Sequence, residues 1–248
     1  MKDREYLWNL PISCLSLNQI SLKIINWALK KESRTVYCCG MNDVVLAEEN
    51  SDLKKILKDS DLLTADGMPL VFLIRKKRKE KIDRGYGPDI FKKVLKVSIN
   101  KKIGHFFLGT TDDNLKKIID IVKTNFGNKN ILKYYAPPFK KEFNEDDLDK
   151  MADLINDKNI NIVWIGMGGA KQIFLADALK KRTKGKVFVT VGAAFDFLTG
   201  NKKQAPVFIQ KIGMEWLFRL ISEPKRLIPR YLRIIKFMFT KTYCRYNR

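Results

Sequence analysis

The sequence predicts an α/β protein with a mostly parallel sheet that helices cover on both faces. Short apolar runs of strand length alternate with longer segments of helical periodicity. Residues 160–165, with the sequence INIVWI, are apolar over nearly their whole length, which is typical of a parallel strand buried on both sides. The chain has 248 residues, 45% of them hydrophobic, so it can bury a large core. These observations favour parallel strands joined by helical crossovers.

The first half of the chain predicts three strands and three helices. The strands are expected at residues 35–39, 62–64 and 105–108. Residues 44–58 carry apolar side chains at helical spacing, and Pro69 stands where the first turn of a second helix, running to residue 75, would begin. A third helix is expected over residues 112–124, capped by Thr111 or Asp112.

The second half continues the alternation and then changes character near residue 201. Strands are expected at residues 131–135, 160–165 and 187–191, and helices at residues 145–156 and 172–182. Beyond residue 201 the pattern becomes helical, aromatic and strongly basic. We therefore expect an α/β domain over residues 1–200 and a basic, amphipathic, helical tail over residues 201–248.

The tail holds twelve basic residues against two acidic ones, and the whole chain holds 48 against 27, a net charge of +21. An excess of this size points to a polyanionic partner, such as nucleic acid, anionic lipid or a diphosphate-bearing substrate. Phe208, Ile212, Trp216 and Leu220 recur every four residues and predict a helix packed on the body. The rest of the tail fits an anionic membrane surface, nucleic acid, or a packed helix with a solvated basic face.

Targeting and redox signals favour a cytoplasmic protein. The first ten residues, MKDREYLWNL, are charged and do not read as a signal peptide, and no window approaches the ~20 apolar residues of a spanning helix. Cys14, Cys38, Cys39 and Cys244 lack zinc-ligand spacing, and the pair at 38 and 39 reads as buried free thiols. We therefore expect membrane contact only at the surface.

Five loops follow predicted strands and could carry chemistry, because ligands of parallel α/β sheets bind at the carboxyl ends of the strands. The loops are residues 40–43 (GMND), 65–69 (ADGMP), 109–112 (GTTD), 166–169 (GMGG) and 191–196 (VGAAFD). The GMGG loop suits either an approaching phosphate or a packing turn, and it matches neither the dinucleotide fingerprint nor the P-loop.

Among single residues, Asp66 could take a proton from an attacking hydroxyl, or it could be a turn or helix-cap aspartate. Arg84 precedes a stiff Gly-Pro turn and could clamp a phosphate or carboxylate. His105, the one histidine of the chain, reads as a core residue. The sequence offers no serine or cysteine triad and no metal-ligand cluster, which disfavours a metalloenzyme.

Eight segments, in this order, resemble the bacterial WecG/TagA/CpsF glycosyltransferase family over roughly residues 35–235. They are residues 64–71 (TADGMPLV), 84–89 (RGYGPD), 106–109 (FFLG), 136–139 (APPF), 171–172 (KQ), 191–197 (VGAAFDF), 213–220 (GMEWLFRL) and 223–227 (EPKRL). The resemblance implies a Rossmann-like fold. It also implies transfer of a hexose, often of N-acetylmannosamine type, from a UDP-sugar to a sugar on a polyprenyl diphosphate at the cytoplasmic membrane face. No metal or other cofactor is implied, nucleic acid is not an expected partner, and a homo-oligomer is left open.

The resemblance also assigns roles to residues of this chain. Asp66 matches the proposed general base and Arg84 an active-site arginine. The tail arginines match groups thought to close over the diphosphate. With the loop positions included, the predicted substrate-binding residues are Asn42, Gly67, Gly109, Lys171, Gln172, Asp196, Arg219, Arg226 and Arg230.

The chain departs from the family pattern at four places near the expected substrate pocket. Gly40 stands where the family usually has asparagine, Ile173 replaces the glutamate of a Pro-Lys-Gln-Glu motif, and Gln204 replaces the arginine of Arg-Ala-Pro. Pro229 replaces a frequent basic residue beside Arg230. These changes favour a different sugar specificity. The alternative is a weakened or inactive family member that only binds a nucleotide sugar.

Overall fold

The computed structural model describes the backbone of residues 3–246 and the side chains of residues 3–240. Within this range the chain forms one sheet of eight strands in the order β1-β2-β4-β3-β8-β7-β5-β6. Every neighbouring pair is parallel except β1 and β2. The strands are β1 Arg4–Leu7, β2 Leu10–Ser13, β3 Arg34–Cys39, β4 Leu62–Ala65, β5 Gly104–Leu108, β6 Leu132–Tyr135, β7 Ile160–Ile165 and β8 Val187–Thr190. The predicted fold class is confirmed.

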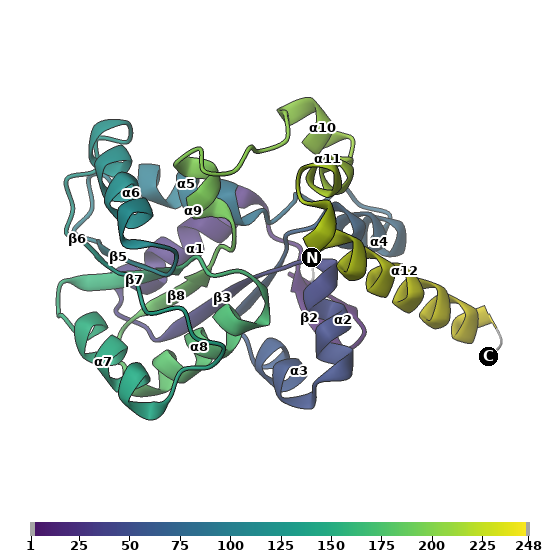
Figure 1. The fold of residues 1–248 in the computed structure, drawn as a ribbon, viewed down its shortest axis with the longest axis horizontal. Coiled ribbons are helices and arrows are strands. Elements are labelled where there is room, and N and C mark those ends of the chain that lie inside the picture. Colours follow the sequence, from purple (N-terminus) through teal and green to yellow (C-terminus); the bar gives the residue numbers. More distant parts are fainter. Residues whose placement is uncertain (1–2, 247–248) are drawn as a thin grey trace.

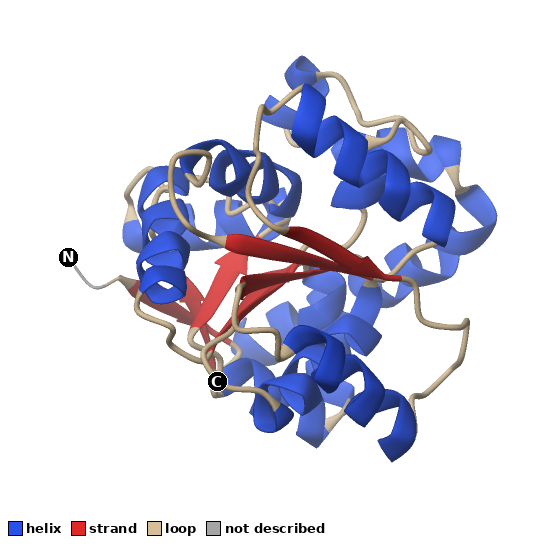
Figure 2. Cartoon of the chain, turned by 90° about the vertical axis from the view of Figure 1, so that its left-hand side faces the viewer, coloured by secondary structure: helices blue, strands red, loops and turns tan. Residues whose placement is uncertain are grey.

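Helices cover both faces of this sheet, which forms the middle layer in Figure 2. Helices α2, α3, α4, α7 and α8 pack on one face, and α1, α5, α6 and α9 pack on the other. The helices are α1 Leu17–Leu29, α2 Met41–Glu49, α3 Ser51–Lys58, α4 Met68–Arg78, α5 Gly87–Val97, α6 Asp112–Thr124, α7 Glu145–Ile155, α8 Gly169–Arg182, α9 Ala194–Leu198, α10 Val207–Lys211, α11 Glu215–Ser222 and α12 Pro224–Tyr246.

The central strand β7 shows why its sequence is continuously apolar. Val163 and Ile165 belong to the core on one face of the sheet, whereas Ile162 and Trp164 belong to the core on the other. Successive side chains of a strand point to opposite faces, so a strand covered on both sides needs apolar residues at every position.

Residues 44–58, predicted as one helix, form two. Helix α2 ends at Glu49, and Asn50 has extended backbone angles, φ −136° and ψ 112°. The Asn50 side chain accepts a hydrogen bond from the Leu53 N–H at 2.9 Å and so caps α3. The prediction of a single helix was wrong because Asn50 caps a new helix, although the spacing of the apolar residues continues from α2 into α3. Strands β1 and β2 and helices α1, α5 and α9 were not predicted from the sequence.

His105 is a core residue, as predicted. It is fully buried, its Nδ1 accepts a hydrogen bond from the Trp164 indole N–H at 3.1 Å, and its Nε2 lies 2.9 Å from the Ser98 hydroxyl. Burial lowers the pKa of His105 to about 3, so the ring is neutral and its Nε2 carries the proton that Ser98 accepts.

The three described thiols are free: Cys39 is buried, and Cys14 and Cys38 are half-buried. Cys244 lies outside the residues whose side chains are described.

The tail begins with two short helices instead of the single helix that the spacing of Phe208 to Leu220 predicts. The chain turns at Gly213, which has a φ of +80° and whose missing Cβ would lie 3.1 Å from the Phe72 ring. A residue with a side chain would be strained in that conformation, so α10 ends before Gly213 and α11 begins after it.

Helix α12 crosses α2 and then extends beyond the body of the molecule (Figure 1). Ile234, Phe237 and Met238 pack against the core, and the Phe237 ring lies 5.4 Å from that of Trp8. These apolar contacts anchor the middle of α12 to the body. Across residues 3–246, no helix combines the length and apolarity needed to cross a membrane.

Candidate active site

A cavity of about 580 Å³ lies where β3, β4, β7 and β8 end. These four strands are neighbours in the sheet, so their carboxyl-terminal loops meet although they are distant in sequence. Helices α11 and α12 of the tail supply the rest of the wall. In parallel α/β proteins this edge of the sheet is the usual ligand site, and the volume suits a small-molecule ligand.

Asp66 follows β4 at the base of this cavity. Its Oδ1 accepts a hydrogen bond from the Gly87 N–H at 2.7 Å, and no described residue donates to its Oδ2. A Cβ at Gly87 would lie 3.1 Å from the Val191 carbonyl oxygen, so glycine permits this close approach. Burial raises the pKa of Asp66, and Glu215 adds to the rise, while Arg84 and the Gly87 N–H act against it. Asp66 is thus a stronger base than an ordinary aspartate.

Arg84 and Glu215 join the α/β body to the tail. The Arg84 Nη1 lies 2.7 Å from Glu215 Oε2, its Nε donates to the Asp66 backbone carbonyl, and its guanidinium stacks 3.6 Å from the centre of the Tyr86 ring. The Tyr86 hydroxyl donates to the other Glu215 oxygen at 2.9 Å. Glu215 is only 7% exposed, so this ion pair is held in a fixed geometry beside Asp66.

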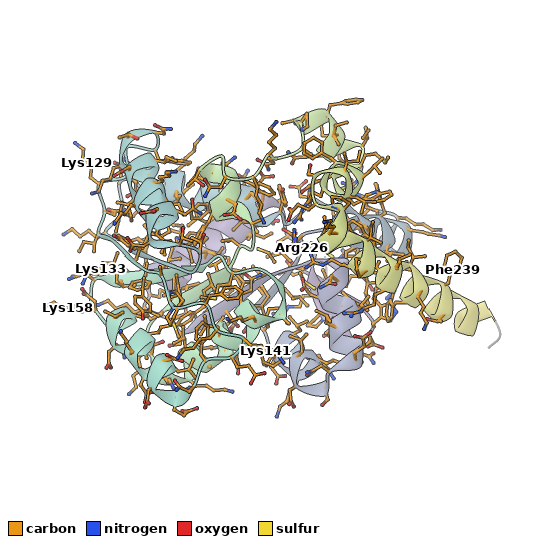
Figure 3. All side chains as sticks on the ribbon, viewed as in Figure 1. Lys129, Lys133, Lys141, Lys158, Arg226 and Phe239 are labelled. Carbon is orange, nitrogen blue, oxygen red and sulfur yellow. The ribbon has the colours of Figure 1, made fainter. Side chains whose placement is uncertain are left out.

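Three tail arginines form a cationic wall opposite the strand ends. Arg219 comes from α11, and Arg226 and Arg230 come from the first two turns of α12. Arg226 also pairs with Glu223 at 2.7 Å. Burial, followed by the neighbouring charges of Arg226 and Arg219, lowers the pKa of Arg230. Figure 3 shows Arg226 at the end of α12 nearest the body. The wall presents mutually repelling positive charges, which an anionic ligand would neutralise.

Gln172 connects two of the strand-end loops. Its Oε1 accepts hydrogen bonds from the Gly168 N–H at 3.3 Å and the Gly192 N–H at 3.1 Å. Helix α8 begins at Gly169, and Gly168 and Gly169 line the cavity, so the N-terminus of this helix lies beside it. A Cβ at Gly166 would lie 2.3 Å from the Phe195 ring, which explains the glycine at that position.

A second carboxylate, Asp43, lines the cavity at the third position of α2 and was not among the predicted site residues. Its Oδ2 accepts a hydrogen bond from the Gly40 N–H at 2.9 Å. Burial raises the pKa of Asp43 to about 6, opposed by the Gly40 N–H. The sequence did contain a signal for this carboxylate. Asp43 comes three residues after Gly40, which has no side chain to cap the helix, and this spacing is that of a capping acid.

Most predicted site residues line the cavity, but two lie outside its wall. The residues in the wall are Asn42, Asp66, Gly67, Arg84, Gln172, Asp196, Arg219, Arg226 and Arg230. Gly109 packs against the Gly166 backbone instead, and Lys171 lies 4.3 Å from the centre of the Phe143 ring and donates to the Lys140 carbonyl. Glu215 and Asp43 are the wall carboxylates that sequence reasoning missed.

Asp196 is the third residue of α9 and lines the cavity. Its Oδ1 accepts from the Asn114 amide at 3.3 Å, and its Oδ2 lies 3.5 Å from the Lys202 ammonium. As for metals, the described residues bring no group of three His, Cys, Asp or Glu side chains together as ligands.

The fold and the site define an α/β protein with a cavity at the carboxyl edge of a mostly parallel sheet, lined by the buried carboxylate Asp66 and by three arginines of the tail. The model of the glycosyl transferase WecG/TagA/CpsF family matches residues 5–248, nearly the whole chain. The chain therefore belongs to this family of glycosyltransferases.

Proposed function

We propose that this protein transfers a hexose, of N-acetylmannosamine type or a related type, from a UDP-sugar to a sugar carried on a polyprenyl diphosphate. The product would serve cell-surface polysaccharide or teichoic acid synthesis. The observation that carries the proposal is the placement of a basic carboxylate, Asp66, and three arginines around one cavity. Sugar transfer from a nucleotide donor needs both a base for the acceptor and positive charge for the leaving diphosphate.

In the proposed reaction Asp66 accepts the proton of the acceptor hydroxyl. The acceptor oxygen then forms a bond to the anomeric carbon of the donor, while the bond from that carbon to the diphosphate oxygen breaks. UDP leaves with the electron pair, and a single displacement of this kind inverts the anomeric configuration. The raised pKa of Asp66 supports its role, because a base works best when its pKa approaches the working pH.

The positive charge that stabilises the leaving UDP comes from Arg219, Arg226 and Arg230 in this proposal. We assign Arg84 a positioning role, because its guanidinium is engaged by the Glu215 carboxylate and by the Asp66 carbonyl. In this proposal the α/β domain of residues 1–200 supplies the base, and the tail of residues 201–248 closes over the donor.

Changing Glu215 to glutamine is expected to shift the acidic limb of the pH–rate profile of sugar transfer to lower pH. The negative charge of Glu215 raises the pKa of Asp66, so removing that charge makes Asp66 easier to ionise. The glutamine oxygen can still accept the hydrogen bond from Arg84, whose charge lowers the pKa of Asp66. Glu49→Gln, an exposed acid outside the cavity, is the matched control and should leave the profile in place. An unchanged profile, or a shift to higher pH, would contradict the coupling of Glu215 to Asp66.

We also propose that the tail rests on the inner face of the cell membrane. Helices α10 to α12 expose large apolar side chains among basic ones: Val207, Phe208, Ile212, Trp216, Ile221, Ile228, Leu232, Ile235 and Phe239. Figure 3 shows Phe239 projecting from the part of α12 that extends away from the body. Exposed aromatic and aliphatic groups interleaved with lysine and arginine suit an anionic lipid surface better than nucleic acid.

A double substitution, Val207→Glu with Phe208→Glu, is expected to lower binding to vesicles containing phosphatidylglycerol by about tenfold or more. Both side chains are about two-thirds exposed, 65% and 69%, so their loss leaves the core intact. Burying a side chain of this size in an apolar phase contributes ~1.5–3 kcal/mol. Phe139→Glu is the control, because Phe139 is fully exposed in the α/β body. Equal loss with the control, or no loss with the double variant, would place the membrane contact elsewhere.

A further inference from the structure

Asp43 has no part in the proposed mechanism, yet it lines the same cavity as Asp66. One of its carboxylate oxygens, Oδ2, is bound by the Gly40 N–H at 2.9 Å. No hydrogen bond from a described residue reaches the other oxygen, Oδ1. A Cβ at Gly40 would lie 3.7 Å from Oδ2, so a longer side chain at residue 40 would stand against this carboxylate. Glycine at that position leaves it open to the cavity.

Helix capping alone does not account for a carboxylate at this position. The bond to the Gly40 N–H needs only an acceptor, which an asparagine amide oxygen would also supply. The charged form is disfavoured by burial and by the nearby charge of Asp66, which Arg230 opposes. A buried carboxylate that lines a cavity and whose pKa is shifted by a specific neighbouring charge is a typical mark of a functional site.

The position of Asp43 indicates which ligand it faces. Its charged neighbours in the cavity are Asp66, which takes the acceptor proton in the proposed reaction, and Arg230, which holds the diphosphate. The transferred sugar must lie between those two groups, because its anomeric carbon bonds to the acceptor on one side and to the diphosphate on the other. A carboxylate near both groups therefore faces the sugar ring.

We propose that Asp43 binds hydroxyl groups of the transferred hexose through its free Oδ1 and determines which UDP-hexose the enzyme accepts. This inference rests on the proposed function. A carboxylate accepts hydrogen bonds from sugar hydroxyls more strongly than a neutral group does, and it rejects a sugar that leaves it unpaired.

The test compares the affinities for UDP-hexoses with the affinity for UDP, measured by calorimetry in the full-length protein. The probes are UDP-glucose, UDP-galactose, UDP-N-acetylglucosamine, UDP-N-acetylmannosamine and UDP. In the wild type the preferred UDP-hexose should bind more tightly than UDP. Asp43→Ala should reduce that advantage by about tenfold or more, Asp43→Asn by an intermediate factor, and UDP itself should bind within about twofold of wild type. Asp52→Asn, an exposed acid in the first turn of α3, is the matched control.

Three outcomes would overturn the proposal. They are a wild type that binds every UDP-hexose no better than UDP, an Asp43→Ala variant that keeps the wild-type preference, and a loss of UDP affinity equal to the loss of UDP-hexose affinity. Because asparagine can keep the bond to Gly40, Asp43→Asn should melt no lower than wild type, so folding can be checked separately. If the wild type shows the binding preference but transfers no sugar, the proposed function fails while the assignment of Asp43 stands.

Discussion

Replacing Asp66 by asparagine is expected to reduce the rate of sugar transfer by about 10²–10⁴-fold, the usual contribution of a general base. Asparagine has nearly the same shape and can accept the Gly87 N–H, but it cannot take up a proton. The affinity for UDP should stay close to wild type, because the diphosphate is held by the tail arginines in the proposed mechanism. Steady-state kinetics and calorimetry with UDP measure the two effects separately.

The pH dependence sharpens this test. Burial raises the pKa of Asp66, so wild-type transfer should fall with decreasing pH at a higher pH than an exposed aspartate would give. This acidic limb of the pH–rate profile reports the ionisation of Asp66, because only the ionised carboxylate accepts a proton. The residual activity of Asp66→Asn should therefore show no acidic limb in its pH–rate profile. The control is Asp112→Asn, an exposed acid at the start of α6, and this variant should keep the acidic limb. Near-wild-type transfer by Asp66→Asn would remove Asp66 from the mechanism.

The location of the site was predictable because it depends on strand direction. Asp66, Gln172 and Asp196 all follow predicted strands, and parallel strands end at one edge of the sheet. What the sequence did not contain was the strand order. Placing β8 between β3 and β7 requires pairings between residues more than 100 positions apart, such as Val36 with Val189. Gly109 lies outside the cavity wall for this reason, since β5 lies one strand farther out.

The unpredicted parts of the site depend on how the tail docks. Glu215 is one of two acids in a strongly basic segment, and its partner Arg84 lies 131 residues earlier in the chain. Local periodicity predicted helices in the tail but did not predict the turn at Gly213. This turn packs against Phe72, which is distant in the sequence, so local periodicity carries no signal for it. Asp43 was overlooked because its significance comes from the open space above Gly40, which is a feature of the folded cavity.

The positive charge of the chain is not confined to the tail. Figure 3 shows Lys129, Lys133 and Lys158 at the edge of the molecule opposite α12, and Lys133 pairs with Asp157. Such lysines are solvated surface charges whose pairs contribute little. Arg219, Arg226 and Arg230 differ because they line the cavity, where burial and the charges of Arg226 and Arg219 disfavour the Arg230 cation. In the proposed mechanism the positions of these three arginines therefore matter more than the net charge of +21.

Arg230→Gln is expected to weaken UDP binding by about tenfold or more, and to slow transfer by about 10²-fold, while the ligand-free protein melts at the same temperature or slightly higher. Burial and the charges of Arg226 and Arg219 disfavour the Arg230 cation in the empty cavity, and glutamine removes that charge but keeps much of the stem. Thermal unfolding with and without UDP, at low and high salt, measures both effects. The stabilisation by UDP should shrink because it follows the affinity.

The control for this experiment is Arg233→Gln, one turn farther along α12. Arg233 lies 4.0 Å from Glu49 and outside the main cavity, so its removal should leave UDP stabilisation unchanged. If UDP stabilises Arg230→Gln as strongly as wild type, the arginine wall does not hold the diphosphate. If instead the variant is more stable when empty and less stabilised by UDP, the same repulsion that destabilises the free enzyme is what the diphosphate relieves on binding.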